Sequence, residues 1–341
     1  MRGRGPGRGR GRGSRARESF CILLAMATTI AGAGAGRAAR TRLTGYIFGV
    51  CAGAIWGTTG PLSTALYAEG AQLTAVGFWR ICLATIGFLV YGLIARDLFR
   101  VDRRAILMVG VVGGSLVAVF EVAFQYAIAG LGVAPAVALL YTAPVVVAVL
   151  AHFILRELLT WQRVALAVMV MIGVALTVNG TVAAAAGEGA TSSASRLAGI
   201  VGGLLSAASY AGTTILARFA VPRYGATRVL FFELLGGTVI LALLLPLLGH
   251  APVPPSTMAG WIYVAALGIG AVLAANFCFF AAVKRIDAAP TAVAASVEPL
   301  VGALLALLLF NQQLRWFGWL GLAMVIGGVS GGAVEEETLE T

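Results

Sequence analysis

Residues 134–174 read APAVALLYTAPVVVAVLAHFILRELLTWQRVALAVMVMIGV, and residues 289–329 read APTAVAASVEPLVGALLALLLFNQQLRWFGWLGLAMVIGGV. With a constant offset of 155 and no gap, the two stretches match at 13 of 41 positions. The matches include Pro135/Pro290, Pro144/Pro299, Trp161/Trp316 and Gly173/Gly328. A shared apolar composition does not readily align two prolines, a tryptophan and a glycine at one offset. The sequence therefore predicts an internal duplication of about half the chain, which is typical of many transporters.

Composition places the chain in the membrane. It is 60% hydrophobic and 11% charged, whereas a typical soluble protein is about 25% charged. Apolar segments of 20 to 26 residues, long enough for lipid-spanning helices, follow one another from residue 45. We expect ten spans, at residues 45–67, 75–95, 105–129, 132–155, 162–182, 196–220, 227–249, 258–283, 288–310 and 315–334.

The distribution of Lys and Arg predicts the orientation. One set of alternate loops carries 11 of them, at Arg96, Arg100, Arg103, Arg104, Arg156, Arg163, Arg218, Arg223, Arg228, Lys284 and Arg285. The opposite loops hold only Arg196 and Arg315. By the positive-inside rule both termini are cytoplasmic, and we expect a multi-pass protein of the plasma membrane. Each half has an odd number of spans, so the predicted fold is an all-α membrane protein with ten transmembrane helices as two inverted five-helix repeats.

The predicted division of the chain has five parts. These are a disordered Arg/Gly-rich N-terminal tail at 1–43, a first repeat at 44–182, a linker at 183–195, a second repeat at 196–334 and an acidic C-terminal tail at 335–341. Residues 1–44 contain ten Arg and one Glu, so they carry most of the net charge of +10. Such a tail either contacts nucleic acid or anionic lipid or is solvated. We favour the solvated state and expect no nucleic-acid partner.

No metal or cofactor is expected. The four Cys are far apart without a C-x-x-C pair, and His152 and His250 cannot form a paired ligand site. Much of the glycine lies inside spans, as at Gly110, Gly113, Gly114, Gly199, Gly202, Gly203, Gly321, Gly327 and Gly328. We interpret it as close helix packing rather than a phosphate loop, so ATP is not the expected energy source.

Several short motifs are similar to those of a known family. They are Trp56-Gly57, Trp79-Arg80, Pro144, Arg156-Glu157 and Glu298-Pro299. Together with the duplication, these resemble the EamA group of the drug/metabolite transporter superfamily over about residues 44–333. The resemblance implies a secondary carrier, often an exporter, of amino acids, other small metabolites or amphipathic compounds. The family commonly closes the helix of the second repeat with Gly-Glu, whereas this chain has Asn311-Gln312 after Phe310.

Four charged residues lie away from the ends of the expected spans, where each costs about 2.5–3.5 kcal/mol to insert. Arg80 and Glu121 fall at similar depth in neighbouring spans, so an ion pair between them is predicted, as a structural lock or as a substrate clamp. For Glu233 we expect a structural pair with Arg228. Glu298 lies near the middle of its span and is our candidate for a cation-binding or protonatable group, the alternative being a carboxylate satisfied by a neighbouring helix.

Prolines mark the expected transport site. Pro299 follows Glu298, and Pro144 holds the matching position in the first copy. A proline opens the preceding helical turn, and two matched broken helices near the middle of the membrane indicate the binding site of an inverted-repeat carrier. Side chains that could line the substrate pathway, rather than only pack helices, are Trp56, Tyr126, Tyr141, Tyr210 and Asn276.

The leading interpretation is therefore a secondary exporter of amino acids or other small metabolites that works by alternating access. An importer and a multidrug-type efflux protein for amphipathic cations are alternatives, and a receptor or scaffold is a remote one. An intramembrane enzyme is disfavoured because Ser115 and Ser206 have no evident His partner at their depth. The expected partners are a small-molecule substrate and the lipid bilayer. Proton coupling and a homodimer are left open.

Overall fold

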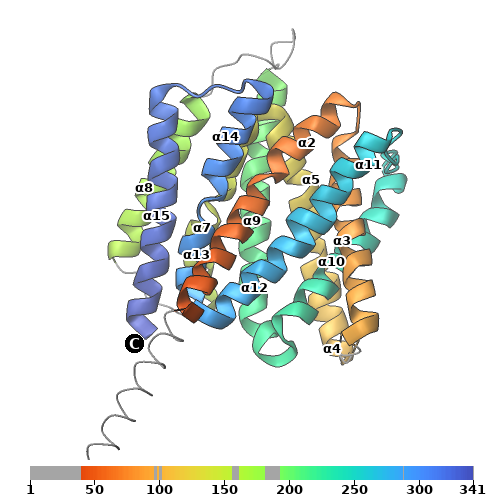
Figure 1. Cartoon of the computed structure of the whole chain (residues 1–341), viewed down its shortest axis with the longest axis horizontal. Coiled ribbons are helices and arrows are strands. Elements are labelled where there is room, and N and C mark those ends of the chain that lie inside the picture. Colours follow the sequence, from red (N-terminus) through yellow and green to blue (C-terminus); the bar gives the residue numbers. More distant parts are fainter. Residues whose placement is uncertain are drawn as a thin grey trace, which may run out of the picture.

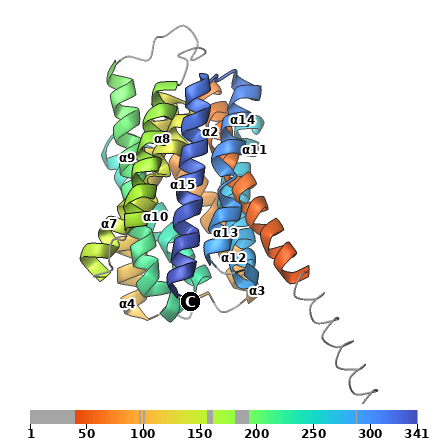
Figure 2. The same ribbon diagram turned by 90° about the vertical axis from the view of Figure 1, so that its left-hand side faces the viewer.

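The computed structural model describes residues 40–95, 98–99, 102–155, 161–180, 193–286 and 288–340. Within these ranges the regular elements are all helices, and they run between the two ends of the molecule (Figure 1 and Figure 2). Helices suit this apolar chain because they satisfy their own backbone hydrogen bonds in lipid. The chain is an all-helical, multi-pass membrane protein, as predicted.

The first helix covers residues 40–57. The elements that follow are α2 (Thr59–Ala68), α3 (Leu73–Ala95), α4 (Arg103–Ala105), η1 (Ile106–Gly113), α5 (Gly114–Leu131), α6 (Val133–Leu140), α7 (Ala143–Leu155), α8 (Trp161–Gly180), α9 (Ser193–Tyr224), α10 (Ala226–Leu247), α11 (Met258–Ala265), η2 (Ala266–Ala274), α12 (Ala275–Ile286), α13 (Ala288–Ala295), α14 (Glu298–Phe310) and α15 (Trp316–Glu340). Two of them, η1 and η2, are π-helical.

The number of membrane spans is only partly supported. Among the described residues, seven helices of 21 to 32 residues are long and apolar enough to cross a membrane. Two further apolar helices, Val164–Gly180 and Trp316–Gly331, are shorter than 18 residues. The span expected at 45–67 is divided at Thr58, whose hydroxyl donates to the Ile55 carbonyl over 2.6 Å. Length and composition alone therefore do not confirm the count of ten.

The two predicted helix breaks are present. Two residues separate α6 from α7, and two separate α13 from α14. Pro144 lies in the first turn of α7 and Pro299 in the first turn of α14. Because proline lacks a backbone donor and disfavours a helical residue before it, each new helix begins close to its proline. The same interruption thus occurs at equivalent positions in both halves.

Glycines bring α8 and α15 into close contact along their length. Their meeting points are Gly180 with Gly318, Gly173 with Gly321, and Val170 with Gly328. Residue numbers rise along one helix while they fall along the other, so the helices are antiparallel. A Cβ at Gly321 would collide with the Gly173 backbone. Close packing, as predicted for the glycines within spans, is confirmed here, and it is what drives helix association in lipid.

Two connections consist of a single glycine. Gly132 joins α5 to α6 with φ of 88°, and Gly225 joins α9 to α10 with φ of 83°. Glycine adopts this backbone region without the strain that a Cβ would cause. The helices on either side therefore form tight antiparallel hairpins.

The ends of the molecule differ in charge. The helix ends at the bottom of Figure 1 carry Arg103, Arg104, Arg223, Arg228, Lys284 and Arg285. We call this the basic end, and the other, which holds Glu69 and Gln312, the opposite end. At the basic end Asp102 pairs with Arg223 over 2.8 Å and accepts a hydrogen bond from the Tyr224 hydroxyl over 2.9 Å. These contacts join the start of α4 to the end of α9.

Some predictions fall on residues outside the described ranges. These are the tail up to residue 39, the Arg156-Glu157 pair, residues 183–192 of the linker and Cys21. The first helix already includes residues 40–43, which corrects the boundary expected for the tail. In the described part of the chain, Cys51, Cys82 and Cys278 are free thiols.

Candidate functional site

Glu298 begins α14 in the interior, at the break of the second repeat. Pro299 follows it in the first turn, where the missing backbone donor costs no hydrogen bond within the helix. The first amides of a helix have no partner within the helix, so this terminus favours a negative group. The local sequence thus presents a half-buried carboxylate at the start of a half-helix.

Tyr141 meets this carboxylate from the break of the first repeat. It lies between α6 and α7, and its hydroxyl donates a hydrogen bond of 3.0 Å to Glu298 Oε2. The helix interruptions at Pro144 and Pro299 are therefore neighbours in space. Of the ten predicted site residues, these four form the centre of the site.

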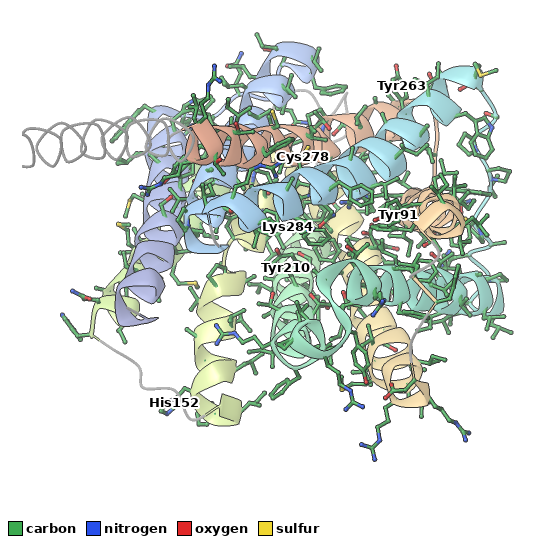
Figure 3. The ribbon with its side chains drawn as sticks, turned by 60° about the horizontal axis from the view of Figure 1, so that its bottom comes forward. Tyr91, His152, Tyr210, Tyr263, Cys278 and Lys284 are labelled. Carbon is green, nitrogen blue, oxygen red and sulfur yellow. The ribbon has the colours of Figure 1, made fainter. Side chains whose placement is uncertain are left out.

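Aromatic side chains surround this centre. Tyr210 of α9 is 50% exposed, yet it lies within electrostatic range of both Glu298 and Tyr141. Figure 3 shows it near the middle of the molecule, whereas His152 lies far out on α7. Trp56 lies at the end of the first helix, just before the division at Thr58. Its ring centroid is 5.3 Å from that of Phe279 in α12. Gly57, next to Trp56, lies against the Glu298 carbonyl, and the helix that carries Tyr210 packs on α6 and α7, so both aromatic residues are on helices that border the breaks.

The predicted ion pair between Arg80 and Glu121 is confirmed. Arg80 Nη1 of α3 lies 3.3 Å from Glu121 Oε2 of α5, with side-chain exposures of 8% and 4%. Arg80 is also within electrostatic range of Glu298. The pair fixes α3 to α5 beside the site. Its role as a lock or a clamp stays a prediction.

A buried polar group beside this pair was missed by the sequence analysis. The Tyr67 hydroxyl donates to Gln125 Oε1 over 2.6 Å, and Gln125 and Ser63 are both fully buried. The spacing of these residues could have predicted the cluster. Ser63 and Tyr67 are four residues apart in one span, and Glu121 and Gln125 are four apart in another. Polar residues at this spacing share a helix face. Within the described residues, three buried atoms here have no hydrogen-bond partner: Ser63 Oγ, Arg80 Nε and Gln125 Nε2.

Two predicted residues are placed differently. Tyr126 is 39% exposed and its Cβ lies beside Gly202 of α9, since it is one position from the inward-facing Gln125. The Asn276 amide donates to the Val272 carbonyl of its own helix stretch over 2.7 Å. Neither residue is brought to the Tyr141 and Glu298 centre by a described interaction, so their roles stay predictions.

The predicted pairing of Glu233 with Arg228 is wrong. Arg228 Nη1 donates to the Tyr224 carbonyl, while Glu233 Oε1 has no hydrogen-bond partner among the described residues. The two positions are five residues apart on α10, which places them about 140° apart around a helix of 3.6 residues per turn. Pairing along a helix requires a spacing of three or four.

Gln312, at the position where this chain departs from the family pattern, contacts the start of a helix in the other repeat. Its Oε1 accepts a hydrogen bond of 3.0 Å from the Val133 amide, at the first residue of α6. A side-chain oxygen that accepts from an initial amide caps the helix. An amide oxygen therefore fills the acceptor role at this point without a carboxylate, and it joins the second repeat to the first.

Helix packing differs between the two ends. Towards the opposite end, α2, α6 and α14 pack against one another. Towards the basic end, α7 packs on α9 and α8, whereas α13 packs on α15 and α12. The half-helices α6 and α14 thus pack against each other towards the opposite end, whereas α7 and α13 pack against different helices towards the basic end.

The chemistry of this centre suits binding rather than covalent catalysis. It offers a carboxylate, a phenol hydroxyl, a paired guanidinium and aromatic faces, which fit a small polar or cationic solute. The two serines considered as nucleophiles bond to their own helices. Ser115 Oγ donates to the Val111 carbonyl and Ser206 Oγ to the Gly203 carbonyl, both over 2.7 Å.

Comparison with known proteins supports the two halves. The model of the EamA-like transporter family matches residues 43–179 and again residues 197–331. No curated protein matches the chain. One solved structure, described only as a crystal structure of a protein, is similar with a TM-score of 0.60 at 20% identity. The match covers 87% of this chain and 99% of that one, and it shows a common fold.

Proposed function

Because the chain belongs to the EamA-like transporter family, we propose that it is a secondary exporter of amino acids or other small metabolites that works by alternating access. The observation that carries the proposal is the hydrogen bond between Tyr141 and Glu298, which joins the interruptions of two equivalent helices in the interior. Such broken helices form the binding sites of carriers built from repeats.

The proposed architecture has ten spans in two inverted five-helix repeats. The equivalent helices α8 and α15 run antiparallel, which is the relation that inversion requires. The basic end is the cytoplasmic side of the plasma membrane, so both termini are cytoplasmic. The opposite end faces outward.

In this proposal Glu298 binds the cationic group of the substrate or a proton, and Tyr141 holds its carboxylate in place. Trp56 and Tyr210 contribute aromatic faces to the pathway, and the Arg80–Glu121 pair fixes the adjoining helices. Tight packing of α2, α6 and α14 supports a state that is closed at the outward-facing end. An exporter loads its substrate from the cytoplasmic side, so this is the state that would accept the substrate.

A substrate panel in proteoliposomes tests the proposal. Purified protein should accelerate the movement of one or more amino acids or small metabolites across the bilayer, and Glu298→Gln should abolish it. Glu69→Gln is a matched control, because Glu69 is an exposed carboxylate at the opposite end that bonds to Thr257. It should transport normally.

The same assay separates the alternatives. In cells, export shows as faster loss of preloaded solute, whereas accumulation would indicate an importer. Transport restricted to amphipathic cations would indicate a multidrug-type protein. No transport of any solute by correctly folded protein would refute the proposal.

A further inference from the structure

Glu233 is a buried carboxylate that the proposed transport site does not use. It is the eighth residue of α10, so it lies about 10 Å along the helix from the basic end. Its exposed fraction is 6%, and within the described residues its Oε1 has no hydrogen-bond partner. Burial without a partner is unusual for a carboxylate and calls for a functional explanation.

The neighbouring helices are shaped to admit this side chain. A Cβ built on Gly113 would lie 2.8 Å from Glu233 Cγ and 3.2 Å from its Oε1, so any larger residue there would displace the carboxyl group. Gly113 ends the π-helical stretch η1, and π-helical turns are frequent at functional sites. Leu216 of α9 borders the same place. The carboxyl group therefore occupies a niche between η1, α9 and α10.

Among the residues that the structure describes, the ionisable groups on the helices packed against α10 provide no counter-ion for this carboxylate. None of the residues of η1 is ionisable, and on α3 and α5 Arg80 and Glu121 pair with each other. Arg228 of α10 donates to the Tyr224 carbonyl, and Arg218 of α9 has an interaction of its own. The residue of α9 that borders the Glu233 carboxyl group is Leu216, and Tyr210 lies six residues before it on the same helix.

A proton is the cation that suits such a niche. An unpaired carboxylate in apolar surroundings is strongly disfavoured, whereas a neutral carboxylic acid is tolerated. A metal ion requires several ligands, and the described residues contain no group of three or more His, Cys, Asp and Glu side chains that could hold one. The niche therefore matches a single proton rather than a metal ion.

We propose that Glu233 is a proton-binding site separate from Glu298, loaded from the basic end, and that its charge acts on the transport site through Tyr210. Leu216, which borders the Glu233 carboxyl group, and Tyr210 are six residues apart on α9, and α9 packs against α6 and α7 on either side of Tyr141. Removing the proton from Glu233 therefore places a negative charge beside the helix that contacts the transport site. The coupling rests on the proposed transport function. Proton binding by Glu233 does not, and it is tested separately.

Infrared spectroscopy tests proton binding without any substrate. Between mildly acidic and alkaline buffer, the wild-type protein should lose the carbonyl stretching band of a neutral carboxylic acid. Glu233→Gln should lack this band, Glu233→Asp should shift it, and Glu69→Gln should retain it. Identical wild-type and Glu233→Gln spectra, or a band that Na⁺ removes at constant pH, would overturn the assignment. If Glu233→Gln does not fold, an unshifted band in Glu233→Asp overturns it equally.

Transport in liposomes tests the coupling. A pH gradient should stimulate the initial rate of wild-type transport, and the ratio of rates with and without the gradient should fall to about one in Glu233→Gln. A ratio equal to that of the wild type refutes the coupling. If the wild type moves no solute but its infrared band still depends on Glu233, the proposed function fails and the proton site stands. If transport occurs but the band is absent, the reverse holds.

Discussion

Replacing Glu121 by Gln tests whether the Arg80–Glu121 pair is a buried ion pair. The atoms that join the two side chains are 3.3 Å apart, and neither side chain is more than 8% exposed. Gln keeps the shape but removes the charge, so the Arg80 guanidinium remains buried without a counter-ion. Breaking a buried pair in this way costs about 3–5 kcal/mol. We expect a loss of that size in the free energy of unfolding.

The double replacement Arg80→Met with Glu121→Met gives the opposite expectation. Removing both charges also removes both desolvation penalties, and such replacements are often neutral or stabilising by about 1–4 kcal/mol. The double variant should therefore be at least as stable as the wild type and clearly more stable than either single variant. A double-mutant cycle measures the coupling between the two side chains.

Denaturant titration in detergent or bicelles, followed by circular dichroism, provides these free energies. A loss below about 1 kcal/mol for Glu121→Gln, the range of exposed pairs, would show that water reaches the pair and would refute the reasoning. Transport by the stable double variant then separates the two roles. Normal rates identify a structural lock, whereas loss of transport with stability retained identifies a substrate clamp.

Three further changes test other parts of the structure. Gly321→Ala should cost about 1–3 kcal/mol because its Cβ meets the backbone of α8, while Gly327→Ala on the same helix meets only the flexible end of a methionine and should leave the thermal midpoint unchanged. Gln312→Ala should cost about 1 kcal/mol of unfolding free energy by uncapping α6, and Gln312→Glu should recover it; equal stability of all three proteins would contradict the capping role. Tyr141→Phe should raise KM for transport about 10- to 150-fold, because a hydrogen bond to a charged group such as Glu298 contributes about 1.5–3 kcal/mol, and an unchanged KM would count against its role.

The sequence allowed the helical fold and the position of the helix breaks to be predicted. Lipid admits few backbone structures, so apolar length alone restricts the fold. Pro144 and Pro299 could be placed at matched breaks because proline acts on its own helix, through local geometry. Both features depend on interactions between residues close in the chain.

Features that depend on which side of each helix faces the interior were harder to predict. Tyr126 and Gln125 are adjacent in sequence, yet Gln125 is fully buried and Tyr126 is 39% exposed. Tyr67 and Gln125 are 58 residues apart in the sequence and lie on different helices. The composition of the chain does not predict that their side chains meet. For Glu233, proximity in sequence suggested Arg228 as a partner, although their spacing places them on different sides of the helix. The angle between two residues around a helix therefore predicts their pairing better than their separation in sequence does.

The buried donors near Arg80 bear on how fast the protein can change conformation. Ser63 Oγ, Arg80 Nε and Gln125 Nε2 lie on α2, α3 and α5, and α2 is one of the helices that pack together towards the opposite end. A buried polar atom without a partner costs about 1–3 kcal/mol. Water that enters when this end opens would supply the missing hydrogen bonds. These hydrogen bonds offset part of the free-energy cost of exposing apolar surface. In the proposed alternating-access cycle, incomplete hydrogen bonding at this end narrows the free-energy difference between the outward-closed and outward-open states, and a smaller difference favours faster turnover.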